Sequence, residues 1–430
     1  MNHPPAMSAF ALSMLFFLQL AVILGVCRLT GLVFKHLGQS QVVSEMVAGM
    51  LLGPSLLGWL SPELSSQLFP PQSKAIIFTV SQVGLVLYMF LIGVEFDASL
   101  IRRRLRTAAS VSVAGIAVPF VMGGGIALII ARDPLFFSEH TSVAQAVLFT
   151  GASMSITAFP MLARIIFEQG LSKTPLGTLA LAAGSIDDAA AWCVLAVILA
   201  SFQSDVMIAI HAIAGGAGFA LLTLLVIKPL LLSLGRRVEQ AGRMSQEMLV
   251  FVLMLLMVGA WFTDRIGIYS VFGAFIVGIA MPRGLFAVEL QRMIQPLTTT
   301  LLLPVFFVYS GLNTKLGLVN TPYLWLMTLV ILTASTLGKG GACYLAARLN
   351  GEPHRQALAV GALMNARGLM ELIILNIGLE RGLIQPGMFA IMVTMAVTTT
   401  LAATPIFERA HGSKASREEA EARTIAQAPG

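Results

Sequence analysis

The sequence predicts an all-α polytopic membrane protein, and three observations lead to that prediction. Hydrophobic residues make up 57% of the 430 residues and charged residues only 11%, whereas soluble globular chains carry about 25% charged residues. Apolar segments long enough to span a bilayer recur along the whole chain. Basic residues gather in alternate connections between these segments, which is the pattern that membrane insertion requires.

Thirteen apolar segments are expected to be transmembrane helices. Their predicted spans are 8–29, 41–60, 74–95, 107–131, 143–167, 175–201, 205–233, 245–263, 267–281, 295–312, 321–347, 355–379 and 385–407. We therefore expect a membrane domain over residues 1–408 and a short, polar cytoplasmic tail over residues 409–430.

Lysine and arginine residues in the connections predict the orientation. Nineteen of them fall in the tail and in one set of loops, and five fall in the opposite set. Because cytoplasmic loops carry the excess of basic residues, the N-terminus is predicted outside and the C-terminus in the cytoplasm. The predicted location is a cell membrane, namely a bacterial inner membrane.

Charge and cysteine content exclude other classes of protein. The formal net charge is +6, but the basic residues lie in short loops and form no basic face, so no nucleic-acid partner is expected. Cys27, Cys193 and Cys343 lie in or beside apolar segments, without the spacing of a disulfide framework or a metal site. The first apolar segment is longer than a signal-peptide core and is predicted to be a retained helix.

Two adjacent acids, Asp187 and Asp188, lie near the middle of the apolar segment 175–201. One aspartate at a helix centre costs about 2.5–3.5 kcal/mol even on the most lenient insertion scale. They are therefore predicted to be functional. The alternatives are a solvated loop pair of a soluble protein, which the composition opposes, and a structural pair buried against a cation.

Two predicted spans read as interrupted helices. Residues 149–160 place small hydroxyl residues before Pro160, and residues 361–371 combine Asn365, Arg367, Gly368 and Glu371 at mid-span. Broken backbone at membrane depth is tolerated where it is buried in protein or lines a cavity. The interruptions fall in the fifth and twelfth spans, each with one more span after it in its half. This arrangement indicates an inverted-repeat transporter with its site at the midplane.

Deep basic residues provide partners for the deep acids. Neighbouring residues on a helix point about 100° apart, so Asp187 and Asp188 cannot face one small space equally. Lys339, flanked by glycines that permit close helix approach, is the predicted partner of Asp187 and a candidate proton switch. Arg367 is predicted to be a fixed charge that holds either Glu371 or the carbonyl ends of a broken helix.

Asp188 is the predicted ligand of a transported hard cation such as Na⁺. The hydroxyls of Ser155 and Thr157, with freed carbonyls of the interrupted fifth span, supply further oxygen donors, and Asp187 completes the predicted ion and proton site. The alternative for the two hydroxyls is a hydrogen bond to their own helix. A carboxylate that binds either a cation or a proton, combined with alternating access, suffices for antiport.

Four stretches carry a resemblance to a known family. They are residues 49–58 (GMLLGPSLLG), 90–97 (FLIGVEFD), 157–164 (TAFPMLAR) and 365–372 (NARGLMEL). With the acidic pair, these stretches resemble the monovalent cation:proton antiporters of the sodium/hydrogen exchanger superfamily. The resemblance covers residues 10 to 408 and is greatest to the branch with bacterial Na⁺/H⁺ antiporters, potassium-efflux antiporters and plant cation/proton exchangers.

The resemblance implies a fold, a site and a cycle. It implies 13 helices with crossed, unwound fifth and twelfth spans, and a core domain that moves against a dimerisation domain like an elevator. It implies that Asp188 binds the ion and the proton, that Asp187 pairs with Lys339, and that Thr157 matches the family's hydroxyl at the break. Two acids with the lysine imply electrogenic exchange, and the family implies a homodimer.

The sequence-based hypothesis is therefore a Na⁺(Li⁺)/H⁺ antiporter with a role in pH homeostasis. We expect a transporter and no enzyme, with no cofactor beyond the transported cation and proton. K⁺/H⁺ exchange on the same scaffold is the nearest alternative. An intramembrane aspartyl protease would need its two acids to meet across two helices, and an organic-anion symporter would not need an acidic pair beside a lysine.

Overall fold

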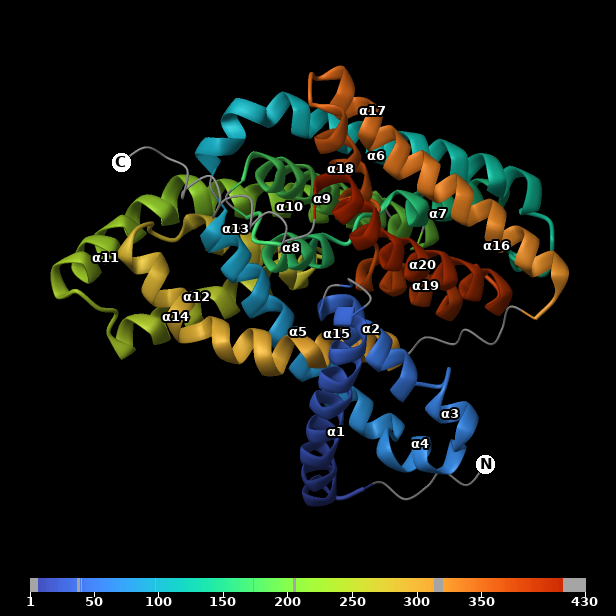
Figure 1. The fold of residues 1–430 in the computed structure, drawn as a ribbon, viewed down its shortest axis with the longest axis horizontal. Helices are drawn as coiled ribbons and strands as arrows, with labels where there is room; N and C mark the ends of the chain where they lie inside the picture. Colours follow the sequence, from blue (N-terminus) through green and yellow to red (C-terminus); the bar gives the residue numbers. More distant parts are fainter. Residues whose placement is uncertain are drawn as a thin grey trace. The chain divides into compact units, whose positions relative to one another are not determined.

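The computed structural model describes residues 7–36, 39, 41–96, 98–172, 174–203, 206–312 and 320–412. These residues are almost entirely helical (Figure 1), and an isolated antiparallel bridge joins Phe137 to Ile384. The chain divides into two compact units. The first comprises Met1–Leu37, Gln41–Phe96 and Gln203–Lys315, and the second comprises Gly38–Ser40, Asp97–Phe202 and Leu316–Gly430.

The first unit contains the N-terminal helices and the central helices of the chain. They are α1 (Ala9–His36), α2 (Gln41–Leu52), α3 (Leu57–Leu60), α4 (Pro62–Leu68), α5 (Pro71–Glu95), α10 (Val206–Leu222), η1 (Thr223–Ile227), α11 (Lys228–Ala241), α12 (Gln246–Arg265), α13 (Ser270–Ala280), α14 (Leu285–Leu297), η2 (Thr298–Leu302) and α15 (Leu303–Leu312). The segments labelled η are single π-helical turns within longer helices.

Two pairs of glycines let helices of this unit approach backbone to backbone. A Cβ added at Gly49 or Gly311 would collide with the backbone of the facing helix, α15 or α2. Gly93 of α5 and Gly278 of α13 meet in the same way. Small residues at such contacts drive helix association where lipid removes the hydrophobic force. Gly49 and Gly93, which belong to the stretches 49–58 and 90–97, therefore have a packing role.

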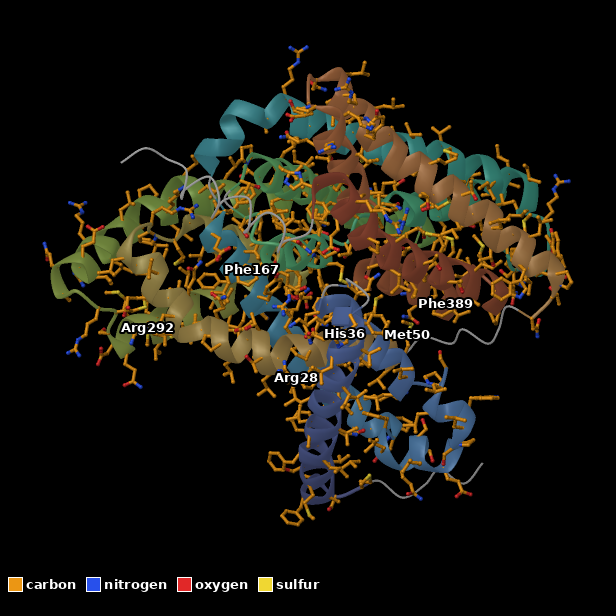
Figure 2. The ribbon with its side chains drawn as sticks, viewed as in Figure 1. Arg28, His36, Met50, Phe167, Arg292 and Phe389 are labelled. Carbon is orange, nitrogen blue, oxygen red and sulfur yellow. The ribbon has the colours of Figure 1, made fainter. Side chains whose placement is uncertain are left out.

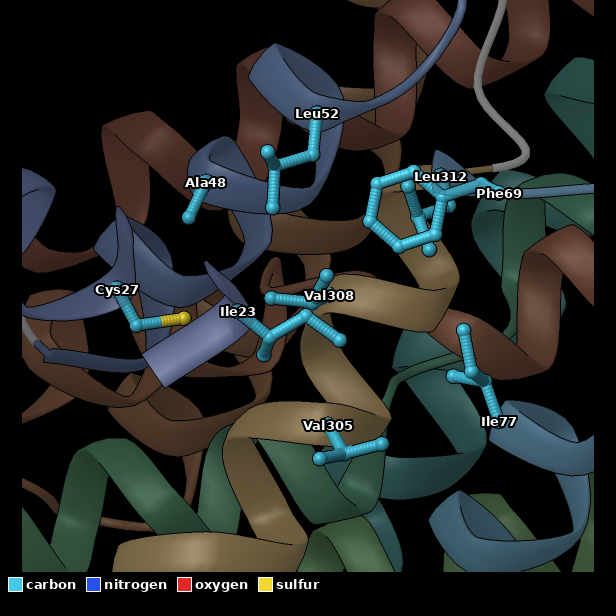
Figure 3. Close-up of a cluster of buried hydrophobic side chains, with 9 residues drawn as sticks. All are labelled: Ile23, Cys27, Ala48, Leu52, Phe69, Ile77, Val305, Val308 and Leu312. Atoms are coloured by element: carbon cyan, nitrogen blue, oxygen red, sulfur yellow. The ribbon is translucent and has the colours of Figure 1, made fainter. Parts of the chain in front are cut away.

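Apolar side chains from α1, α2, α5 and α15 form a buried cluster in this unit (Figure 3). Ile23, Ile77, Val305 and Val308 are fully buried at its centre, and Phe69, from the connection before α5, closes one side. The cluster joins segments that are more than 200 residues apart in the chain, so it fixes the position of α15 against the N-terminal helices.

The second unit contains the predicted site. Its helices are α6 (Ala98–Ile130), α7 (Val143–Ser155), α8 (Phe159–Glu168), α9 (Pro175–Gln203), α16 (Pro322–Ser335), η4 (Thr336–Gly341), α17 (Ala342–Leu349), α18 (His354–Met364), α19 (Leu369–Glu380) and α20 (Pro386–His411). Within this unit α6 runs beside α16 and α17 (Figure 1), and it also packs along α7.

Local sequence explains where α7 begins. Ser142 and Gln145 form a capping box, in which the serine hydroxyl accepts from the Gln145 backbone at 3.2 Å and the glutamine side chain accepts from the Ser142 backbone at 3.0 Å. This pair satisfies two N–H groups that a helix start would otherwise leave without partners. The start of the interrupted fifth span is therefore encoded locally.

The prediction of an all-α membrane protein is confirmed. Among the residues that the structure describes, nine helical segments are long and apolar enough to cross a membrane. The predicted span 267–281 corresponds to a shorter apolar helix, α13. Large apolar side chains such as Phe10 and Trp261 are mostly exposed, as expected of surfaces that face lipid.

Several predicted boundaries were wrong. The first helix continues past residue 29 to His36; Figure 2 labels Arg28 and His36 on α1. The predicted span 41–60 has the same bounds as an apolar segment long enough to cross a membrane, but its helix is interrupted between α2 and α3 at Gly53 and Pro54, because a proline disfavours helical backbone at the residue before it.

Two other predicted spans are parts of longer helices. The span 205–233 extends to Ala241, and the span 295–312 belongs to a helical run that starts at Leu285. In each run a π-helical turn lies next to a proline, Pro229 or Pro296. Such a turn rearranges the backbone hydrogen bonds that a proline interrupts, so the helix continues.

The predicted tail begins within a helix. α20 continues through residues 409–411 and ends at His411, so the helix extends beyond the predicted domain boundary at residue 408. Residues 413–430 of the predicted tail lie outside the described residues.

Candidate ion-binding site

The first helix break separates α7 from α8 and consists of residues 156–158. α7 ends at Ser155, and Ile156 adopts extended backbone with ψ of 134°. Pro160 lies in the first turn of α8, where its missing N–H removes no helical hydrogen bond. The proline therefore starts the second half-helix, and the unwound residues precede it.

The second break, residues 365–368, separates α18 from α19. It contacts the first break directly. The Ala158 N–H donates to the Ala366 carbonyl at 3.2 Å, and the Thr157 hydroxyl lies 3.4 Å from the Met364 carbonyl. Both interrupted helices that the sequence predicts are thus present, and their breaks meet within the second unit.

Asp187 lies at the centre of a buried hydrogen-bond network. One carboxylate oxygen accepts from the Ser112 hydroxyl at 2.5 Å. The other accepts from the Thr157 hydroxyl at 2.7 Å and from Lys339 Nζ at 2.9 Å. The residue is 1% exposed. A buried carboxylate with three donors, one of them charged, is the arrangement in which an ionised acid is tolerated inside a membrane.

Lys339 is fully buried and belongs to the π-helical turn η4. Besides its 2.9 Å ion pair with Asp187, its ammonium donates to the Gly115 carbonyl at 3.0 Å and to the Ser155 carbonyl. These bonds use all three donors of a lysine ammonium. The Ser155 carbonyl is one of those that the end of α7 leaves without a helical partner, so Lys339 links the acid to the first break.

The structure places the other two predicted ligands close by. Asp188 is 5% exposed and follows Asp187 on α9. The Ser155 hydroxyl lies 2.6 Å from the Gly151 carbonyl and 3.0 Å from the Ile116 carbonyl. The bond to Gly151 is the back-bond to the same helix that was the alternative for this hydroxyl. The roles of these residues as ion ligands stay predictions.

Arg367 makes both of the contacts that were weighed as alternatives. Its guanidinium lies 3.5 Å from the Glu371 carboxylate, and it also donates to the carbonyls of Ser153 at 3.0 Å and Met154 at 2.6 Å. The arginine is fully buried. Because the end of a helix carries unpaired carbonyls and partial negative charge, this cation caps α7.

Asn365 closes the end of α18, and its side chain lies beside Gly340 of η4. The residue is 4% exposed. A Cβ added at Gly340 would lie 3.9 Å from the amide carbon of Asn365, so the glycine next to Lys339 leaves the space that Asn365 fills. Glu371 is 1% exposed, and in the described part of the chain its oxygens accept no hydrogen bond apart from the ion-pair contact with Arg367.

A pocket whose empty volume, including space open to solvent, is about 250 Å³ reaches the acidic network within the second unit. Its lining residues come from α6, α7, the first break and α9; they are Ile116, Phe120, Ala152, Ser155, Ile156, Asp187, Ala190, Ala191 and Val194. The wall is mostly apolar, and Asp187 and Ser155 supply its polar atoms. An ion in this pocket would meet a carboxylate at one side and low-dielectric walls elsewhere.

Four residues of this network were not predicted from the sequence: Ser112, Gly115, Ser335 and Thr400. Ser112 and Gly115 are on α6; the signal for Gly115 was Pro119 inside the same helix, whose missing N–H leaves the Gly115 carbonyl without its helical donor. Ser335 accepts from Arg367, and its signal was a hydroxyl one helical turn before Lys339. Thr400 contacts the backbone of Arg367. Its signal was the run of three threonines at 398–400 in an apolar helix.

Residues 20–409 match the sequence profile of the transmembrane sodium/hydrogen exchanger family. The chain belongs to this family. The family predicted from the four stretches and the acidic pair is therefore confirmed. The Na⁺/H⁺ antiporter NhaS4 of Synechocystis sp. is 41% identical over 394 residues, which cover 90% of this chain and 94% of that protein.

Other exchangers are longer than this chain. Cation/H⁺ antiporter 17 of Arabidopsis thaliana is 35% identical, with 91% of this chain and 48% of that protein aligned. K⁺/H⁺ antiporter 1 of Saccharomyces cerevisiae is 31% identical, with 91% and 46% aligned. The chain thus spans about half the length of these plant and yeast relatives. All three named relatives are antiporters, which agrees with the prediction of a transporter and no enzyme.

A solved structure shares the fold. The sodium/proton antiporter MjNhaP1 of Methanocaldococcus jannaschii superposes with a TM-score of 0.62 over 92% of this chain and 96% of that one, at 17% identity. The all-α fold of the exchanger family is therefore the fold of this chain.

Proposed function

We propose that this protein is a secondary active antiporter that exchanges Na⁺ or Li⁺ for H⁺ by alternating access. The observation that carries the proposal is the buried network in which Asp187 contacts Lys339 and Thr157 beside two crossed helix breaks. The names of the relatives, Na⁺/H⁺ and cation/H⁺ antiporters, support the same reaction.

Competition for carboxylates provides the coupling in this proposal. Asp188 binds the cation or a proton, with Thr157, Ser155 and Asp187 as further oxygen donors. Asp187 holds Lys339 while the site is free of a cation. When a cation approaches through the pocket, its charge competes with the Lys339 ammonium for the Asp187 carboxylate, and a displaced, desolvated ammonium releases its proton readily. Two proton-carrying groups for one cation make the exchange electrogenic.

The wider architecture belongs to the same proposal. We place thirteen spans in the membrane, with the N-terminus outside, the C-terminus in the cytoplasm and a bacterial inner membrane as the location. The second unit moves as the transport core against the first in an elevator-like cycle, and two copies form a homodimer. The division of the chain into two compact units supports the two-body description.

K⁺/H⁺ exchange is the second candidate, and the yeast relative named as a K⁺/H⁺ antiporter favours it. The same carboxylates would serve either ion, since both are hard cations that prefer oxygen ligands. Selectivity then depends on the size of the oxygen cage that the two breaks form. An organic-anion symporter or an aspartyl protease has no comparable support in the site.

Purified protein in proteoliposomes tests the reaction. An imposed Na⁺ or Li⁺ gradient should drive proton movement that a trapped pH dye reports, and a K⁺ gradient should drive less. Asp188→Asn should abolish exchange, because an amide cannot alternate between a proton and a cation. In wild-type protein the apparent cation affinity should fall as pH falls. Exchange that persists in Asp188→Asn, or cation binding that ignores pH, would contradict the proposal.

A further inference from the structure

Thr400 lies in α20, and its fully buried hydroxyl contacts the backbone of the second break. It accepts from the Arg367 N–H at 2.8 Å. It also lies 2.8 Å from the carbonyl oxygens of Arg367 and Ala396, which share its proton. Backbone groups in an unwound segment lack the partners that a helix supplies. One side chain therefore satisfies the N–H and contacts the carbonyl of the same break residue.

The neighbouring Thr399 has the ordinary bonding of a buried helical threonine. It is 1% exposed, and its hydroxyl lies 3.0 Å from the carbonyls of Met395 and Ala396 on the same helix. Such back-bonding is the default for threonine in an apolar helix. Thr400 shares the back-bond to Ala396 and differs from Thr399 in its contact with another segment. The two adjacent residues thus form a matched pair.

The contact at Thr400 reaches the first break through Arg367. The backbone of Arg367 is held by Thr400, and its side chain donates to the Ser153 and Met154 carbonyls at the end of α7. The next residue, Ser155, offers its carbonyl to Lys339. A shift in the Arg367 backbone therefore displaces the oxygens that surround the acidic network.

We propose that Thr400 is a positioning residue of the ion site: its hydroxyl fixes the Arg367 backbone, and Arg367 in turn fixes the carbonyls at the first break. Thr400 acts through Arg367 and is not itself an ion ligand. The inference rests on the proposed function only in that the positioned oxygens serve a transported cation.

Transport kinetics in proteoliposomes give the first test, with Na⁺, Li⁺ and K⁺ as the probes. Thr400→Val keeps the shape of the side chain and removes the hydroxyl, leaving a buried N–H without its partner. We expect about a tenfold rise in the apparent KM for the driving cation, with the turnover number close to wild type. Thr400→Ser should restore the wild-type KM, and Thr399→Val should leave it unchanged.

Hydrogen–deuterium exchange of the purified protein gives a second test that needs no transport. In Thr400→Val, peptides that cover residues 361–371 and 150–158 should exchange faster than in wild type, whereas Thr399→Val should leave them unchanged. If Thr400→Val does not yield folded protein, Thr400→Ala takes its place with the same expectations. The inference would be overturned if the Thr400→Val and Thr399→Val variants behaved alike in both tests. It would also be overturned if Thr400→Ser failed to restore the wild-type KM and hydrogen-exchange rates.

The two tests separate this inference from the proposed function. If wild-type protein exchanges no cation for protons, the proposed function fails, and the hydrogen-exchange comparison still decides whether Thr400 fixes the breaks. If wild-type protein is active and Thr400→Val matches it in KM and hydrogen exchange, the role of Thr400 fails alone.

Discussion

The two helix breaks of the second unit are equally buried and have different kinds of partner. At the first break, Thr157 and the Ser155 carbonyl contact Asp187 and Lys339. A carboxylate and an ammonium can each gain or lose a proton. At the second break, the Arg367 backbone contacts a threonine hydroxyl. The Arg367 guanidinium keeps its charge at any physiological pH.

This difference divides the chemistry between the breaks. Asp187 and Lys339, which can change protonation or exchange a partner, lie at the first break, where the pocket also ends, whereas Glu371, the carboxylate beside the second break, is paired with Arg367. The second break contributes a permanent positive charge and a rigid backbone, which hold the end of α7 in place. Changes at the first break should therefore alter how many charges move in each cycle. Changes at the second break should alter the free energy of unfolding and the KM for the cation.

Of the substitutions that test the difference between the two breaks, replacing Lys339 should have the largest effect on stability and on the charge moved per cation. Lys339→Ala leaves the buried Asp187 carboxylate without its cation, and breaking a buried ion pair in this way costs about 3–5 kcal/mol of stability. We expect a lower melting temperature in detergent, and fewer charges moved per cation in proteoliposomes at controlled membrane voltage. Asp187→Asn combined with Lys339→Gln should recover part of the stability and keep the altered charge count. A Lys339→Ala protein with wild-type charge count would contradict a proton-carrying role.

Arg367→Lys tests the second break with its charge retained. Lysine lacks the planar fork that reaches several carbonyls at once, so the Ser153 and Met154 carbonyls lose donors while the ion pair with Glu371 can persist. We expect a loss of about 1–3 kcal/mol in unfolding free energy, measured by thermal unfolding in detergent, and a raised KM for the cation. The charge moved per cation should stay at the wild-type value; a changed count would mean that the second break takes part in proton transfer.

Gly115→Ala should give the smallest effect and sharpen the description of the first break. A Cβ at Gly115 would lie 2.6 Å from Cys343 Sγ, too close for two non-bonded atoms, and 3.9 Å from Lys339 Nζ, an ordinary contact distance, so the added methyl strikes the sulfur beside the lysine. Overpacking of this kind costs about 1–3 kcal/mol; because the struck atom is the end of a single side chain, we expect the low end of this range and a smaller fall in melting temperature than for Arg367→Lys.

Gly125→Ala on the same helix is the control, because no atom of the described residues lies within 4 Å of the added atom. Cys343→Ala in the Gly115→Ala background should restore stability by removing the sulfur that is struck. If the double variant is no more stable than Gly115→Ala alone, the crowding at Cys343 is not the cause.

The interrupted helices were predictable because their causes are local. Pro160 in an apolar run, and Asn365, Arg367 and Gly368 together at mid-span, disfavour a continuous helix on any scale of helix propensity. The acidic pair was equally visible, since carboxylates are rare at membrane depth. The ends of the helices were less predictable: α1 continues through Arg28 to His36, because a basic residue near a helix end can snorkel to the interface.

Partners across helices could not be predicted to the same extent. Ser112 is an unremarkable serine of an apolar helix until α6 is packed beside α9, where it lies 2.5 Å from Asp187. Thr399 and Thr400 are adjacent members of one run of threonines, and only the packing of α20 against the second break gives one of them a contact with Arg367.

The sequence by itself determined the class of protein, the family, the two interrupted helices and the charged residues at membrane depth. These follow from composition and from local backbone chemistry, which neighbouring residues impose on one another. The tertiary structure alone decided which oxygen atoms those charges meet. Hydrogen bonds form over about 3 Å, and packing brings Ser112, Asp187, Lys339 and Thr157 within that distance although up to 227 residues separate them along the chain.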